Sequence, residues 1–334
     1  MQKRWFLVAA LFGAALVAAA CSGDDGSGSD AVTSTPDGNG SAIRPGSILH
    51  GARLDLALRL DSSPLSIELR SLQHAGWDGC LGLRIEGEPC TEQFIGGYIA
   101  FFGRGEAPPF RYHVGGALFL AVDFLDGEVS DGIAVPAEIR TDFEAVLAAY
   151  AREDLALLLD IEARTITIEA IVPMQFSDSC IGFAQPGQAC AQAITAGGFV
   201  LLRAEGQEYR YHFARGGWLV ATDFVAGMVT AEPDGGVIAV QRAMREDLAS
   251  RLGVGLGGVS VSAYREVIWR NGCLGVQRPG EVCTDALVEG FLALLRAEGN
   301  EYRYHGRGDA FIAASFEDGA TIVDPLPPSD EDGP

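Results

Sequence analysis

The sequence predicts an α+β chain of three tandem modules, each with one helix packed on an antiparallel sheet of about four strands and with a local disulfide loop. Three observations predict this. Residues 201–212 and 294–305 are identical at eleven of twelve positions. Six cysteines fall into three pairs whose members stand ten positions apart. Each copy shows a helical pattern followed by alternating apolar residues.

A helix opens each module. In the second copy a capping box, Thr141 to Glu144, precedes apolar residues at helical spacing as far as Leu159. The stretches 47–60 and 240–252 are its counterparts. An alternating strand follows each helix, with these apolar positions: Leu65, Ile67, Leu69; Ile166, Ile168, Ala170; Val259, Val261, Ala263. Alternation predicts one buried and one wetter face of the sheet.

The cysteine loop comes next. Two glycines recur in it at matching offsets, which favours backbone conformations that glycine adopts most easily. Zinc is the rival of a disulfide here, but its usual ligand spacing is tighter and these loops lack neighbouring His or Cys partners. We therefore expect three structural disulfides, each contributing about 3 kcal/mol by the chain-entropy estimate. They join Cys80 to Cys90, Cys180 to Cys190 and Cys273 to Cys283.

Three more strands complete each predicted module, connected in copies two and three by short hairpin turns. They span 97–102, 110–114 and 117–124 in the first copy, 198–203, 208–213 and 218–224 in the second, and 290–296, 301–305 and 310–316 in the third.

The N-terminus has the pattern of an export signal. Lys3 and Arg4 precede an apolar run of sixteen residues that ends at Ala20, too short for the roughly twenty needed to span a bilayer. The residues before Cys21 resemble the lipobox of bacterial lipoproteins, and lipidation of Cys21 would account for an odd total of seven cysteines. The resemblance implies a protein anchored by lipid to the extracytoplasmic face of a bacterial membrane, inner or outer.

The predicted boundaries follow from these features. They are a signal peptide at 1–20, a lipidated cysteine with a disordered tether at 21–46, modules at 47–135, 140–235 and 238–318, and a loose acidic, proline-rich tail at 319–334. Without the signal, 22 basic residues face 45 acidic ones, which argues against nucleic acid as a partner.

Candidate binding residues recur in every copy. Arg and His alternate with tyrosine in the third strand, so each Arg/His pair lies on the face away from the tyrosines: Arg111, His113; Arg210, His212; Arg303, His305. These pairs could grip a carboxylate or phosphate, or they could be structural and pair with the abundant acids. Trp77 and Trp269, just ahead of the cysteine loops, are likewise either packing residues or contacts for a ligand.

Catalytic motifs are missing from the sequence. Lys3 is the only lysine, which excludes Schiff-base and P-loop chemistry, and the motifs of serine and zinc hydrolases are absent. We expect no metal and no cofactor. Tandem copies favour binding, so the hypothesis is a non-catalytic envelope protein that restrains a protease or contacts a peptide or glycan. A hydrolase with a site assembled between modules, and a structural spacer, are the alternatives.

Two resemblances rest on these motifs. The stretches from Trp77 to Cys90 and from Trp269 to Cys283, with the Tyr-x-Tyr-His line that follows, resemble a repeat of secreted bacterial lipoproteins of unassigned function. The order of elements is also similar to PepSY domains, and that similarity implies restraint of a protease.

Overall fold

The computed structural model describes residues 45–87, 89–116, 118–134, 143–215, 217 and 219–326. The predicted signal peptide, Cys21, almost all of the tether, Thr141 of the capping box and Trp218 lie outside the described residues. None of the helices in these ranges is both long and apolar enough to cross a bilayer.

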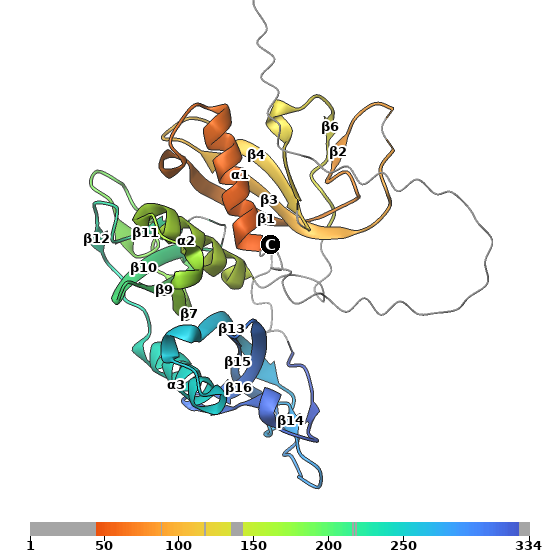
Figure 1. Cartoon of the computed structure of the whole chain (residues 1–334), viewed down its shortest axis with the longest axis vertical. Helices are drawn as coiled ribbons and strands as arrows, with labels where there is room; N and C mark the ends of the chain where they lie inside the picture. Colours follow the sequence, from red (N-terminus) through yellow and green to blue (C-terminus); the bar gives the residue numbers. More distant parts are fainter. Residues whose placement is uncertain are drawn as a thin grey trace, which may run out of the picture. The chain divides into compact units, whose positions relative to one another are not determined.

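Each module consists of one helix and a four-stranded antiparallel sheet, as the sequence predicts (Figure 1). Module 1 contains α1 (Pro45–Arg59), β1 (Glu68–Trp77), β3 (Ile95–Gly103), β4 (Phe110–Gly115) and β5 (Leu118–Ala121), in the sheet order β1-β3-β4-β5. Figure 1 shows α1 lying across this sheet. The first strand of every module is therefore an edge strand.

The other two modules repeat this order. Module 2 contains α2 (Phe143–Leu159), β7 (Thr167–Phe176), β9 (Thr195–Ala204), β10 (Gln207–Ala214) and β11 (Leu219–Ala221). Module 3 contains α3 (Gly235–Leu252), β13 (Ser260–Trp269), β15 (Val288–Ala297), β16 (Asn300–Arg307) and β17 (Ala310–Ile312).

A second, two-stranded sheet in each module is not predicted by the sequence. The residues that follow the cysteine-loop turn pair with the segment that follows the fourth strand. The pairs are β2 (Leu83–Arg84) with β6 (Glu128–Val129), β8 (Phe183–Ala184) with β12 (Met228–Val229), and β14 (Val276–Gln277) with β18 (Thr321–Ile322). The start of the acidic tail, expected to be loose, is thus part of module 3.

Two further details differ from the expectation. The fourth strand ends early, at Ala121 and Ile312 in modules 1 and 3, and a 3-10 turn follows it. Helix α3 begins at Gly235 rather than Val240, because the Asp234 carboxylate accepts a hydrogen bond from the backbone N–H of Gly236 and caps the helix.

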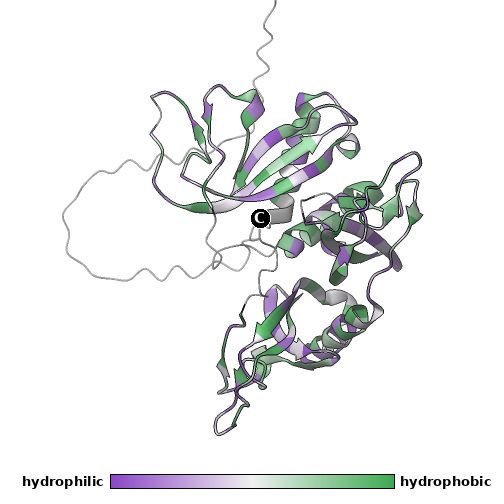
Figure 2. Cartoon of the chain, turned by 180° about the vertical axis from the view of Figure 1, so that it is seen from behind, coloured by the Kyte–Doolittle hydropathy of each residue, from purple (hydrophilic) through white to green (hydrophobic). Residues whose placement is uncertain are grey.

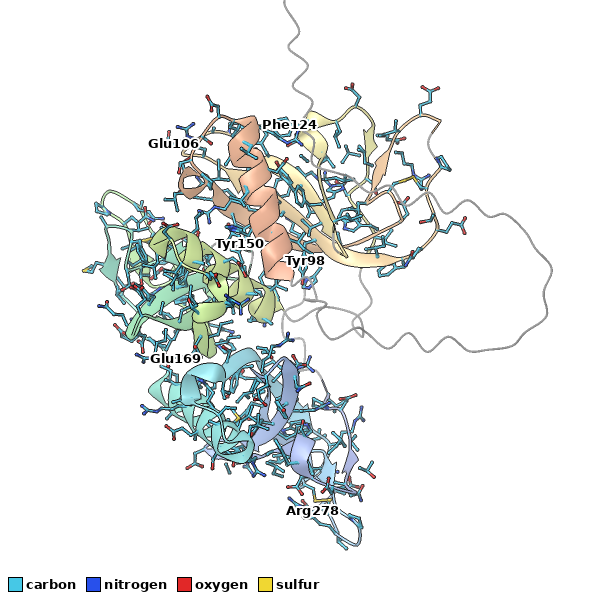
Figure 3. The ribbon with its side chains drawn as sticks, viewed as in Figure 1. Tyr98, Glu106, Phe124, Tyr150, Glu169 and Arg278 are labelled. Carbon is cyan, nitrogen blue, oxygen red and sulfur yellow. A yellow bond between two sulfur atoms is a disulfide. The ribbon has the colours of Figure 1, made fainter. Side chains whose placement is uncertain are left out.

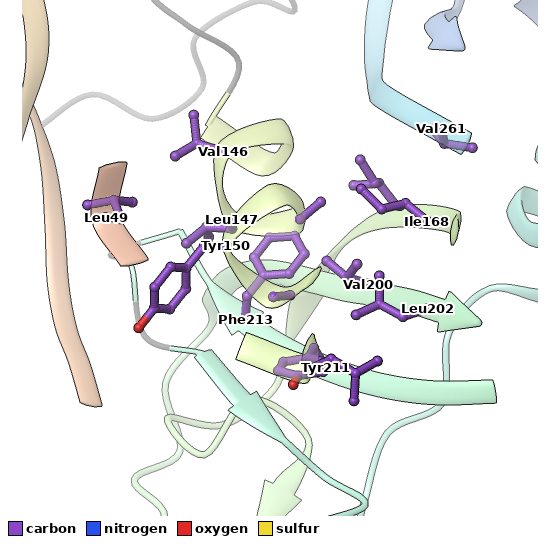
Figure 4. Packing of buried hydrophobic residues seen from close by; sticks show 14 of the residues in the cluster. Leu49, Val146, Leu147, Tyr150, Ile168, Val200, Leu202, Tyr211, Phe213 and Val261 are labelled. Atoms are coloured by element: carbon purple, nitrogen blue, oxygen red, sulfur yellow. The ribbon is translucent and has the colours of Figure 1, made fainter. Parts of the chain in front are cut away.

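The core lies between each helix and its sheet. In module 2, Leu147 and Tyr150 of α2 pack with Val200, Leu202 and Phe213 of the sheet (Figure 4). Both hydrophobic and hydrophilic residues occur on the strands (Figure 2), and in the central strand β9 six consecutive residues are buried because both faces of this strand are covered. Tyr112, Tyr211 and Tyr304 are fully buried and belong to this core.

The two junctions between modules use different contacts. At the first, the buried guanidinium of Arg53 in α1 donates to the carboxylate of Asp154 in α2. At the second, the side-chain amide of Gln241 in α3 bonds both the N–H and the carbonyl of Ile171 in edge strand β7, at 3.0 and 2.7 Å. Glu169 of β7 also forms an ion pair with Arg245 of α3 (Glu169 is labelled in Figure 3).

Candidate functional site

The three predicted disulfides are present: Cys80–Cys90, Cys180–Cys190 and Cys273–Cys283. The third closes the loop that carries Arg278, labelled in Figure 3. Their sulfurs are covalently paired and do not act as thiolate ligands, although Asp78 lies near one pair and Asp178 near another.

The repeated histidines do not stand on an open face. His113, His212 and His305 lie on the side of the sheet away from the buried tyrosines, as alternation predicts, yet all three are fully buried. Each ring Nδ1 donates to a main-chain carbonyl of the cysteine loop, that of Leu81, Ile181 or Leu274, at 2.6, 2.8 and 2.6 Å. The loop folds back over this face, which the sequence pattern does not reveal.

The histidine bond fixes a difficult turn. Leu81, Ile181 and Leu274 have positive φ angles of 49°, 51° and 52°, a conformation costly for residues with bulky side chains. A buried hydrogen bond to each carbonyl holds the turn in place. Burial lowers the pKa of all three imidazoles, and that of His305 falls to about 4, so the rings are neutral near pH 7.

The tryptophans fill space beneath the loops. Trp77 and Trp269 are almost completely buried, and each stacks on the histidine of its own module at a ring-centroid distance of 4.2 Å. Their indole N–H groups donate to main-chain carbonyls. Burial leaves neither ring able to contact a ligand at the surface, so the packing interpretation fits them.

The repeated arginines pair with acids, as the structural alternative expects. Arg111 contacts Asp131 at 3.0 Å, Arg210 contacts Glu232 at 2.7 Å, and Arg303 contacts Asp324 at 2.8 Å. Each acid follows the fourth strand of its module, so each pair ties the folded-back segment to the sheet. An arginine already paired in this way is a weaker candidate for gripping an anion.

A repeated Tyr–Asp bond was not predicted. The buried hydroxyls of Tyr112, Tyr211 and Tyr304 donate to aspartates of the helices at 2.8 Å in every module. The three bonds join residues 57 positions apart. The signal was present in the sequence, because all three helices carry an Asp-Leu-Ala triplet at this point: 55–57, 154–156 and 247–249.

A hollow of about 690 Å³ lies in module 3, between the start of α3 and the outer half of β13. Its size falls in the range of about 300–1,000 Å³ that ligand sites show. Apolar and aromatic side chains line it: Val237, Val240, Tyr264, Val267, Ile268 and Phe291. Four acidic residues complete the lining: Asp234, Glu266, Glu289 and Asp309. The sequence analysis did not single out any of these residues.

The hollow is negatively charged and lacks internal counter-ions. None of its four acids forms an ion pair with an arginine in the described ranges. Tyr264 is 4 % exposed, and its hydroxyl makes no hydrogen bond within those same ranges. Burial, with Glu266 and Asp234 nearby, raises the pKa of this hydroxyl above its usual value, so the phenol stays protonated. The site can therefore receive a cation with apolar surface beside it.

Comparison with known proteins gives one match. The model of a family described as a domain of unknown function, DUF8738, matches residues 148–222 and 241–313. No curated protein and no solved structure shows a significant match. The two matched stretches run from the helix into the fourth-strand region of modules 2 and 3, so the DUF8738 model matches the chain twice in tandem.

Proposed function

We propose that the chain is a non-catalytic binding protein held on the extracytoplasmic face of a bacterial membrane by lipid on Cys21. Three disulfides are typical of an oxidising compartment, which supports the export part of the proposal. The partner is an envelope protein, peptide or glycan.

The hollow of module 3 carries the binding part of the proposal. Its lining combines apolar side chains with carboxylates that have no arginine partner in the described ranges. An apolar lining with a few convergent polar groups is typical of ligand sites. A spacer has no need of a concave surface lined by apolar side chains and carboxylates without arginine partners.

The buried, hydrogen-bonded positions of the repeated histidines support binding over catalysis. A general base must reach the proton that it abstracts. In each module the imidazole instead lies buried, with Nδ1 bonded to a loop carbonyl. The residue type best suited to acid–base chemistry near pH 7 is thus used to fix the cysteine loop.

Affinity capture from an envelope extract tests the proposal. Residues 22–334, immobilised, should retain a partner saturably, and excess free 22–334 should compete it away. Turnover of an ester, peptide or glycoside panel by the same material would favour a hydrolase with a site between modules. Neither retention nor turnover would leave the structural spacer as the better description.

A further inference from the structure

We propose that the hollow of module 3 binds a polypeptide segment of a partner protein that presents an arginine or lysine next to an aromatic or aliphatic side chain. The inference rests on the proposed binding function and names the partner's chemistry. Three observations support it: what occupies the same place in module 1, the charge of the hollow, and the unsatisfied hydroxyl within it.

Module 1 holds a side chain from the next module at the equivalent place. His74 and Tyr98 are register partners across β1 and β3, as Glu266 and Phe291 are across β13 and β15. The ring of Phe143, at the start of α2, lies 5.7 Å from the ring of His74 and 6.4 Å from that of Tyr98. Phe143 is 7 % exposed. The start of α2 thus already places a buried aromatic side chain on this surface of module 1.

Module 2 is also covered by the module that follows it. Val237 and Ile238 of α3 pack against its outer apolar cluster, while Gln241 bonds the edge strand at Ile171. That cluster lies on the cysteine-loop face of the sheet, opposite the helix face that Phe143 covers in module 1. In module 3 the place that matches His74 and Tyr98 is part of the hollow.

The matching places in modules 1 and 3 differ in charge, so they favour different side chains as occupants. Where module 1 has His74, module 3 has Glu266, with Glu289 on the neighbouring strand. A guanidinium or ammonium group fits these carboxylates, because charge-assisted hydrogen bonds are the stronger ones. The stacked rings of Tyr264 and Phe291, 5.1 Å apart, offer an aromatic surface to the same cation.

The hydroxyl of Tyr264 supplies the polar group that a polypeptide would use. Tyr264 lines the hollow, and no described residue forms a hydrogen bond with its hydroxyl. This phenol can donate to a main-chain carbonyl of the bound segment or accept from its guanidinium. A small amine would satisfy the charge but would leave much of the apolar floor uncovered.

The test uses a displayed random peptide library panned on immobilised 22–334, followed by fluorescence anisotropy on the enriched peptides. The variant Glu266→Gln/Glu289→Gln removes two charges from exposed strand positions of the hollow. Its matched control, Glu86→Gln/Glu92→Gln, removes two charges from exposed positions in and just after the cysteine loop of module 1. Melting temperatures of both variants check that each remains folded.

The expected result is enrichment of peptides with a basic residue beside an apolar one. Their dissociation constants should rise about tenfold or more in Glu266→Gln/Glu289→Gln and stay nearly unchanged in the control. Enrichment without basic residues, no enrichment, or equal weakening in both variants would overturn the inference.

Two added probes separate the other occupants. Arginine amide binding as tightly as the enriched peptides would show a small-amine site. Tighter binding of a synthetic peptide of residues 40–46, which contains Ile43 and Arg44, would show that the chain's own N-terminal segment is the occupant. Either result overturns the inference. Partner capture that survives Glu266→Gln/Glu289→Gln would leave the binding function standing and refute only this site.

Discussion

Acid should destabilise module 3 through His305, and the size of the effect can be worked out. The imidazole of this residue is fully buried, donates from Nδ1 to Leu274, and accepts at Nε2 from the Arg303 side chain at 2.5 Å. Protonation at Nε2 would remove that acceptor and place a positive charge beside Arg303. Burial accordingly lowers the pKa of His305 from 6.5 to about 4.

The direction of the pH effect follows from proton binding. Below pH 6.5 the unfolded imidazole takes up a proton, whereas the folded one does so only near pH 4. Acid therefore stabilises the unfolded state, and stability is lost as the pH falls from about 6.5 to about 4. Between pH 7 and pH 5 the linkage amounts to about 2 kcal/mol of unfolding free energy for this one group.

Tryptophan fluorescence during urea denaturation measures this loss within module 3. In residues 22–334, the changes Trp77→Phe and Trp218→Phe leave Trp269, which stacks on His305, as the only tryptophan. Phenylalanine already stands at the matching place in module 2, as Phe176. The variant His305→Asn keeps a neutral side-chain donor that takes up no proton, so its stability should fall by about 2 kcal/mol less between the two pH values. Equal losses in both proteins would refute the reasoning.

Replacing Cys21 with Ser should release the exported protein into the soluble fraction, and retention in the membrane fraction after signal removal would contradict the lipid anchor. Asp154→Ala should lower the free energy of unfolding by about 3–5 kcal/mol, because it leaves the buried Arg53 charge without its partner. Asp55→Ala should cost less, since its arginine partner is more than one-third exposed; urea denaturation of the two variants checks the order. Replacing both cysteines of Cys180–Cys190 by alanine should cost about 3 kcal/mol in the same assay, and unchanged stability would show that the bond is dispensable.

Local sequence patterns predicted the helices, strands and disulfides of each module, because each of these patterns involves residues that lie close together in the sequence. The placement of Tyr211 and His212 on opposite faces of the sheet followed from strand alternation alone. The burial of His212 did not, because it depends on a loop and a ribbon that fold back from more than fifteen residues away on either side. Alternation shows which face a side chain takes and says nothing about what covers that face.

The hollow of module 3 could not be predicted from the sequence, for a related reason. Its lining comes from the start of α3, from β13, from β15 and from the turn after β16, and no repeated motif connects these segments. The informative signal was a difference between copies: Glu266 occupies the place held by His74 in module 1 and by Pro173 in module 2. A search for features shared by all copies misses a site that exists in one of them.

The contacts between consecutive modules change the interpretation of the three tandem copies. Three equivalent Arg/His surfaces would raise avidity by offering the partner three copies of one site. The structure instead buries the three histidines, and it packs side chains of the following module against modules 1 and 2: Phe143 beside His74 of β1, and Val237 and Gln241 of α3 against module 2. Covering an edge strand in this way also prevents unwanted pairing with other chains. In module 3 the place that matches His74 holds Glu266 and is part of the hollow, which carboxylates line. The proposed binding site therefore belongs to a single module of the described chain, the one farthest along the sequence from the proposed lipid anchor.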